Sequence, residues 1–163
     1  MTTTFRYNRW KILRELAFIV GSIGLAIWIC VLAATGGATI RGNNAAAFVF
    51  LISIAWSALA SIGLIAYAPC LFAPFALRIE PGALHVFAGV VGWPPRLVET
   101  RLQTPPGAVL VVHDYGAASE TPLSGTREGR SVSTRGVYLI WRLVQDQAGA
   151  CAAVEAMSRA DAA

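Results

Sequence analysis

Two long apolar segments near the N-terminus are the feature that most constrains how this chain can fold. Between Leu16 and Leu77 the only charged residue is Arg41, and 56% of the 163 residues are hydrophobic. A soluble domain of this length has a core too small to bury both segments, because small domains enclose little interior volume. The sequence therefore predicts an integral membrane protein.

The first predicted span covers 16–35, which as a helix would be about 30 Å long and would match the hydrocarbon core of a bilayer. A cleaved signal peptide is the alternative, but the apolar core of a signal peptide has only about 7–15 residues. The second predicted span covers 45–68, because Pro69 and Pro74 cannot continue a regular helix. The two spans are expected to form a helical hairpin.

The distribution of basic residues predicts the orientation of this hairpin. Four basic residues precede the first span, and one lies in the connecting loop, 36–44. Cytoplasmic flanks carry the excess of Lys and Arg, so both termini are expected in the cytoplasm and the loop outside. Arg outnumbers Lys twelve to one, a composition typical of GC-rich bacterial genomes, so the expected location is the bacterial inner membrane. The segment 69–76 is expected to connect the second span to the cytoplasmic domain along the membrane interface.

The N-terminal segment, 1–14, is expected to contact the membrane surface. Its basic residues are Arg6, Arg9, Lys11 and Arg14. Each one contributes about 1 kcal/mol of attraction near an anionic leaflet, and salt weakens that attraction. We expect these residues to hold the segment flat on the inner leaflet. The alternative is that they only set the topology during insertion.

Small residues recur along both predicted spans and suggest how the hairpin packs. Lipid gives helices no hydrophobic reason to associate, so close packing and hydrogen bonds between serines become important. The alternative is that small residues are simply common in membrane helices. Neither span carries an ionisable residue in its interior, which argues against a transporter or a channel. The predicted packing positions are Ser22, Ala26 and Cys30 on the first span and Ser53, Ser57 and Ser61 on the second.

The last part of the chain, 77–163, is predicted to be a cytoplasmic β domain. Alternating apolar and polar residues indicate half-buried strands, and Pro81-Gly82 fits the centre of a tight turn. Asp146 is a suitable N-cap for an Ala-rich helix that ends near Arg159. The predicted strands cover 77–80, 83–87, 96–103, 108–113 and 136–144.

The polar segment 114–134, rich in Gly and Ser, is predicted to be a disordered loop, with a functional loop as the alternative. The fold class that follows is membrane α+β. It consists of a two-helix transmembrane hairpin, a small antiparallel β domain and a C-terminal helix.

This layout resembles small bacterial two-transmembrane proteins with a pleckstrin-homology-like cytoplasmic domain. The resemblance is carried by the two N-terminal spans, the Pro-rich exit and the first strands, Leu77-Arg78-Ile79-Glu80-Pro81-Gly82-Ala83-Leu84. It is carried further by the Gly92-Trp93-Pro94-Pro95 link and by the final strand and helix, Val137 to Met157. The resemblance rests on layout and on no invariant motif. It implies a pleckstrin-homology-like fold and a role in the assembly of membrane complexes.

The sequence offers few residues for catalysis or for cofactors. His85 and His113 are the only groups that titrate near neutrality, and we expect His85 to be solvated and His113 to lie at the surface of a strand end. No nucleophile-elbow, phosphate-loop or metal-ligand spacing accompanies them. We therefore expect no enzyme activity, no cofactor, no metal and no nucleic-acid partner. The cysteines, Cys30, Cys70 and Cys151, are not expected to form disulfides.

The sequence leaves two classes of function open. The first is a non-catalytic accessory or scaffold protein, whose hairpin anchors a cytoplasmic domain that docks on other membrane proteins. The second is an inner-leaflet module that binds lipid or peptide, and an enzyme is a distant third. The oligomeric state stays open.

Overall fold

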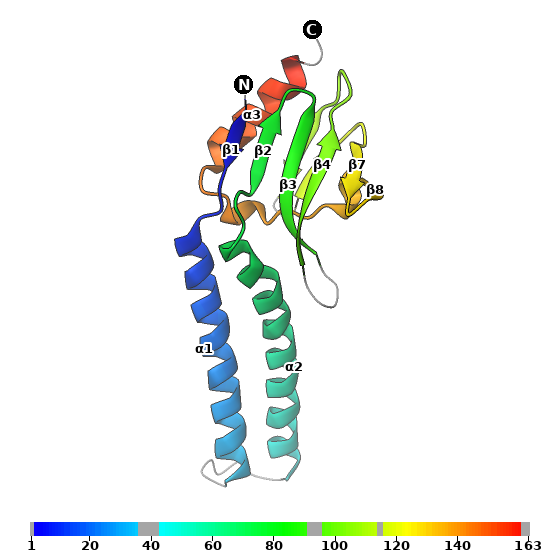
Figure 1. Ribbon diagram of the computed structural model, residues 1–163. Helices are drawn as coiled ribbons and strands as arrows, with labels where there is room; N and C mark the ends of the chain where they lie inside the picture. Colours follow the sequence, from blue (N-terminus) through cyan, green and yellow to red (C-terminus); the bar gives the residue numbers. More distant parts are fainter. Residues whose placement is uncertain (1, 36–42, 91–95, 114–115, 161–163) are drawn as a thin grey trace.

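The computed structural model describes residues 2–35, 43–90, 96–113 and 116–160 (Figure 1). It is an α+β structure in which two long apolar helices lie side by side and lead into an antiparallel sheet with a C-terminal helix. Both helices are long and apolar enough to cross a membrane. Most of the predicted external loop and the predicted Gly92–Pro95 link lie outside the described residues.

The helical hairpin consists of α1 (Arg9–Ala34) and α2 (Asn43–Tyr67), and α2 is followed by the short 3-10 helix η1 (Ala68–Leu71). Helix α1 begins earlier than predicted because Asn8 is its N-cap and accepts a hydrogen bond from the Lys11 backbone N–H at 3.1 Å. The basic residues of 9–14 are thus the first turns of α1. The prediction that 1–14 is a separate segment is wrong, because it contains the strand β1 (Thr3–Phe5) and the start of α1. Its contact with the inner leaflet stays a prediction.

The main sheet has six strands in the order β1-β2-β3-β4-β7-β8, and each pair of neighbours is antiparallel. A two-stranded sheet, β5-β6, is inserted between β4 and β7 in the sequence. The strands are β1 (Thr3–Phe5), β2 (Leu77–Glu80), β3 (Ala83–Val90), β4 (Arg96–Gln103), β5 (Leu110–His113), β6 (Gly116–Ser119), β7 (Ser124–Arg127) and β8 (Arg130–Ser133).

Strand β1 precedes α1 in the chain, and β2 follows α2. They are neighbours in the sheet, with Thr3 opposite Ile79 and Phe5 opposite Leu77. The two helices therefore leave the sheet from adjacent strands, as Figure 1 shows. Strand β1 was not predicted from the sequence.

The predicted disordered loop, 114–134, is wrong for its described residues, because they form β6, β7 and β8. Glu128 and Gly129 form the turn between β7 and β8 with φ values of 50° and 74°. Gly125 sits where β7 meets β4, and a Cβ there would lie only 1.8 Å from the Arg101 carbonyl oxygen. This segment is ordered by backbone pairing, so its polar composition does not make it a loop.

The predicted strand 136–144 is also wrong. Its alternation is real, because Val137, Leu139, Trp141 and Leu143 are buried, but the chain passes through two 3-10 turns and joins no sheet. Its backbone partners lie at the start of α1: the Asn8 N–H donates to the Leu143 carbonyl at 2.7 Å, and the Gln145 N–H donates to the Arg6 carbonyl at 2.8 Å. We call 137–145 the strap, because it ties the β domain to the hairpin.

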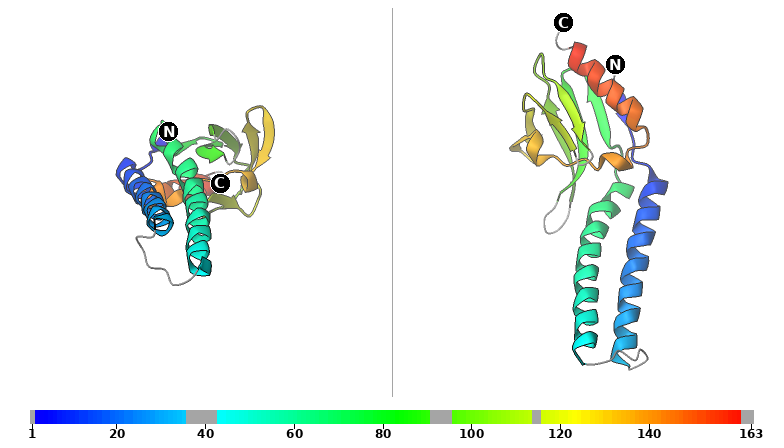
Figure 2. Two further views of the ribbon diagram at one scale, coloured as in Figure 1. Left: turned by 90° about the horizontal axis from the view of Figure 1, so that it is seen from below. Right: turned by 180° about the vertical axis from the view of Figure 1, so that it is seen from behind.

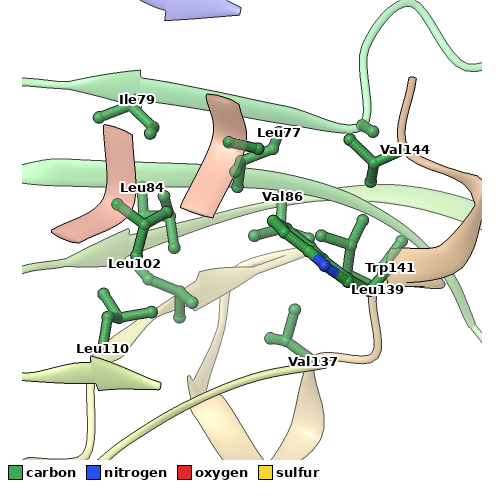
Figure 3. Close-up of a cluster of buried hydrophobic side chains, with 14 of the residues drawn as sticks. Leu77, Ile79, Leu84, Val86, Leu102, Leu110, Val137, Leu139, Trp141 and Val144 are labelled. Atoms are coloured by element: carbon green, nitrogen blue, oxygen red, sulfur yellow. The ribbon is translucent and has the colours of Figure 1, made fainter. Parts of the chain in front are cut away.

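Helix α3 (Gln147–Ala160) starts as predicted, since Asp146 Oδ1 accepts a hydrogen bond from the Gly149 N–H at 2.9 Å. It packs against β2 on one face of the main sheet and against β5, and Figure 2 shows it from behind. The core lies between this helix, the sheet and the strap. Figure 3 shows its side chains, among them Leu77, Leu84, Val86, Leu102, Leu110, Leu139 and Trp141.

Candidate functional site

The richest polar cluster lies on the face of the main sheet opposite α3. Side chains alternate along a strand, so Leu84 and Val86 point into the core and His85 points to the opposite face. Arg78 pairs with His85 across β2 and β3, and Phe87 pairs with Glu99 across β3 and β4. This register gathers charged side chains from three strands. We call Arg78, Glu80, His85 and Glu99 the charged cluster.

His85 is held between two carboxylates. Its Nδ1 lies 2.7 Å from Glu99 Oε1 in a hydrogen bond, and its Nε2 lies 3.3 Å from Glu80 Oε2 without the geometry of a hydrogen bond. The imidazole is only 12% exposed, so the prediction of a solvated His85 is wrong. The alternation predicted its face of the sheet correctly, but the neighbours across the strands enclose the ring.

Arg78 completes the cluster and ties it to aromatic residues. Its guanidinium lies 3.9 Å from Glu80 and 3.6 Å from Glu99. The same group stacks over the Phe75 ring at 4.3 Å, and Phe75 makes an edge-to-face contact with Phe87 at 5.3 Å. Half-exposed ion pairs contribute about 0–1 kcal/mol each, so the network orders this surface more than it stabilises the fold.

Both ring nitrogens of His85 in the charged cluster face carboxylates. Among the residues that the structure describes, no group of three His, Cys, Asp or Glu side chains could hold a metal ion. His113 ends β5 and is exposed, as predicted, and it takes no part in the ion pairs of the cluster.

A second polar region lies where the hairpin meets the β domain. Tyr7 is buried there, and its hydroxyl donates a hydrogen bond to the Phe87 carbonyl at 2.7 Å. Burial raises the pKa of Tyr7, and the neighbouring Cys70 thiol raises it further, so the hydroxyl stays neutral. A hollow of about 380 Å³ opens beside Tyr7 and Cys70, and Arg6 and Arg9 are among the residues that line it.

The other side of this junction is held by Arg142 of the strap. Its guanidinium lies 3.7 Å from Glu15 of α1, stacks over the Tyr67 ring of α2 at 5.2 Å and donates a hydrogen bond to the Tyr67 hydroxyl. Arg142 thus links the strap to both helices. Sequence reasoning missed this site, although an acidic residue just before an apolar span was a usable signal.

The predicted packing positions of the hairpin are placed unevenly. Ala26 and Ser53 are buried, Ser22, Cys30 and Ser57 are half-buried, and Ser61 is exposed. The predicted hydrogen bonds between serines of different helices are wrong for Ser22 and Ser61. Ser22 donates to the Ile19 carbonyl at 2.8 Å, and Ser61 donates to the Ser57 carbonyl at 2.7 Å, each within its own helix. The predicted surface contacts Arg6, Arg9 and Arg14 are exposed, and Lys11 is half-buried.

Comparison of the chain with protein-family models, with curated proteins and with solved structures gives no match.

Proposed function

We propose that this chain is a non-catalytic accessory protein of the bacterial inner membrane, whose hairpin anchors a cytoplasmic docking domain. The observation that carries the proposal is the junction of hairpin and domain. Both apolar helices connect through short segments to adjacent strands of one sheet, and the strap binds the start of α1. A domain held in this way keeps a fixed height and tilt above the bilayer, which suits a scaffold.

The membrane location rests on the surface of the hairpin. Large apolar side chains are exposed there, among them Phe18, Trp28, Ile54 and Leu59. Such a surface is unfavourable in water and favourable in lipid. The basic residues at the start of α1 support an orientation with both termini in the cytoplasm. In a chain with its native cysteines replaced by Ala, an Asn43→Cys variant should react with an impermeant maleimide in intact spheroplasts. Labelling only after the inner face is opened would reverse the topology.

The docking surface is the sheet face that carries the charged cluster. Helix α3 packs against the other face, whereas Arg101 and Gln103 stand exposed beside the cluster. An antiparallel sheet with a C-terminal helix also supports the pleckstrin-homology-like relationship that the layout of the sequence implies. The cluster supports a non-catalytic role, because both ring nitrogens of His85 face carboxylates and Arg78 pairs with the same two carboxylates.

The test is photo-crosslinking in living cells from one residue on each face. A benzoylphenylalanine at Gln103 should form an adduct with a distinct protein, and the same probe at Ala152 on the exposed side of α3 should not. Both positions are solvent-exposed, so the second is a matched control for the first. Adducts that are identical from both positions, or absent from both, would contradict docking through the sheet face. Adducts with lipid alone from Gln103 would favour the alternative, an inner-leaflet lipid-binding module.

A further inference from the structure

A continuous groove runs between α1 and α2 along one side of the hairpin. Its lower part is a hollow of about 550 Å³, and its upper part, toward the β domain, is a hollow of about 280 Å³. The two parts share Phe18, Ser22 and Trp56, so they form one path. Gly21 lines the lower part and leaves open space there, whereas Gly63 lines the upper part and lies close to Ile19.

The walls of this groove are almost entirely apolar. Ser22 and Ser53 are the polar side chains of the lower part, and the Ser22 hydroxyl is already bonded within its own helix. The walls therefore offer mainly hydrocarbon to an occupant, with the Ser53 hydroxyl and the Trp56 indole N–H as polar groups. This matches an acyl chain, which has no polar group to satisfy.

The upper end of the groove is polar and carries excess positive charge. Glu15, Tyr67 and Arg142 line it, and the Arg142 side chain is 49% exposed. Its guanidinium has five N–H donors, more than Glu15 and Tyr67 take up. Lys11 lies one helical turn before Glu15 on the same face of α1, and Arg14 lies one turn before Phe18. With Arg142, this places three basic residues and one acidic residue within about one helical turn of this end.

We propose that this groove is a binding site for one anionic phospholipid. The acyl chain lies between Phe18 and Trp56, and the phosphate binds to Arg142 and Lys11. The inference rests on the proposed membrane location, because the basic end then lies at the headgroup level of the inner leaflet. The charge favours this occupant over a second copy of the hairpin, whose helices would use the apolar walls but not the cations.

Two glycines of α1 provide a matched test. A Cβ added at Gly21 or at Gly24 meets nothing within 4 Å, so a larger side chain can start at either position without a clash at its first atom. Leucine also favours a helix more than glycine does. Only Gly21 lines the groove. The Gly21→Leu variant therefore fills the site, whereas Gly24→Leu adds the same side chain to the same helix outside it.

The experiment is native mass spectrometry of the full chain, delipidated in mild detergent and then titrated with phosphatidylglycerol or phosphatidylcholine. The wild type and Gly24→Leu should retain one phosphatidylglycerol, and Gly21→Leu should lose this binding. Lys11→Gln should weaken it about fivefold, as expected for the loss of one cation near the phosphate. Circular dichroism establishes that each variant keeps its helix content.

Equal binding of both lipids, equal binding by the two leucine variants, or a dimer that excludes lipid would each overturn the proposal. So would displacement of the lipid by glycerol phosphate alone, because that ligand has no acyl chain for the groove. Extraction of cell membranes with alkaline carbonate tests the proposed membrane location separately. A chain that resists extraction but shows no lipid preference loses only this inference.

Discussion

The hairpin and the β domain use the same apolar residue types in opposite ways. In the domain Leu84 is fully buried, whereas in the hairpin Leu59 is 65% exposed. Removal of a leucine side chain from water is favourable in both regions. In the domain the protein core provides the apolar surroundings, whereas an exposed leucine of the hairpin requires an apolar medium outside the protein. Under the proposed membrane location, the exposed apolar side chains of the hairpin face lipid instead of water.

The sharpest test of this comparison is the same substitution made once in each region. Leu84→Ala should lower the free energy of unfolding of the β domain by about 2–5 kcal/mol, because it opens a cavity in the core. Leu59→Ala removes the same atoms from an exposed position and should change it by less than about 0.5 kcal/mol. Urea unfolding of the full chain in mild detergent, followed by near-ultraviolet circular dichroism, measures both. Similar losses would remove the distinction between the two regions.

An added charge should disturb the hairpin and leave the β domain unaffected, which is the reverse of the leucine substitutions. Ile54→Arg places a guanidinium near the middle of α2 at a position that is 51% exposed, and this should cost about 2.5–3.5 kcal/mol of insertion free energy. Tyr138→Arg adds the same charge at a 62% exposed position of the domain and should leave insertion unchanged. The fraction of each variant that resists carbonate extraction reports the result. If Ile54→Arg inserts as well as the wild type does, α2 does not lie in lipid.

Within the domain, the start of α3 should depend on its cap. Asp146→Ala removes the hydrogen bond to the Gly149 N–H and should destabilise the domain by about 0.5–2 kcal/mol. Glu155→Ala, which breaks only an exposed ion pair with Arg159, should cost about 0.5 kcal/mol or less. Hydrogen exchange of the α3 amides follows both variants. Faster exchange for Glu155→Ala than for Asp146→Ala would contradict the role of the cap.

The smallest expected effect belongs to the junction of the two regions. Tyr7→Phe removes the hydrogen bond to the Phe87 carbonyl and should cost about 1 kcal/mol at neutral pH. Because burial raises the pKa of Tyr7, its contribution is fully present below the unfolded pKa of about 10 and declines above it. The wild type should therefore lose more unfolding free energy than Tyr7→Phe does between about pH 9 and pH 11. Parallel losses would show that Tyr7 ionises freely in the folded chain.

Hydrophobic pattern predicted the parts of this fold in which burial is one-sided. The four strands 77–80, 83–87, 96–103 and 108–113 alternate against one core, and the helices carry long apolar runs. The structure has each of these elements, although its β3 extends to Val90 and its β5 begins at Leu110. Strands β7 and β8 escaped prediction because they are mostly solvent-exposed, so backbone pairing and the turn at Glu128-Gly129 define them without an apolar pattern.

The other elements were predicted wrongly because their backbone or side-chain partners lie far away in the sequence. β1 has three residues, and its partner strand lies beyond both helices, so nothing local in the sequence marks it. The strap has the alternation of a strand, but its backbone bonds go to Arg6 and Asn8. In the charged cluster, alternation predicts that His85 faces away from Leu84, yet it cannot show that Glu99, which pairs with Phe87 on the next strand, reaches the His85 ring. Local pattern gives the direction of a side chain, and topology gives its neighbours.

The pairing of β1 with β2 also acts on how the chain is assembled in the membrane. Under the proposed topology β1 is synthesised first and has no partner until α1 and α2 have both crossed. A product with only one helix inserted leaves Thr3 and Ile79 on opposite sides of the bilayer, where they cannot meet. The edge of the sheet is then incomplete, and unpaired edges invite aggregation. Under the proposed topology, only a chain with an even number of crossings can bring β1 beside β2 and close the sheet.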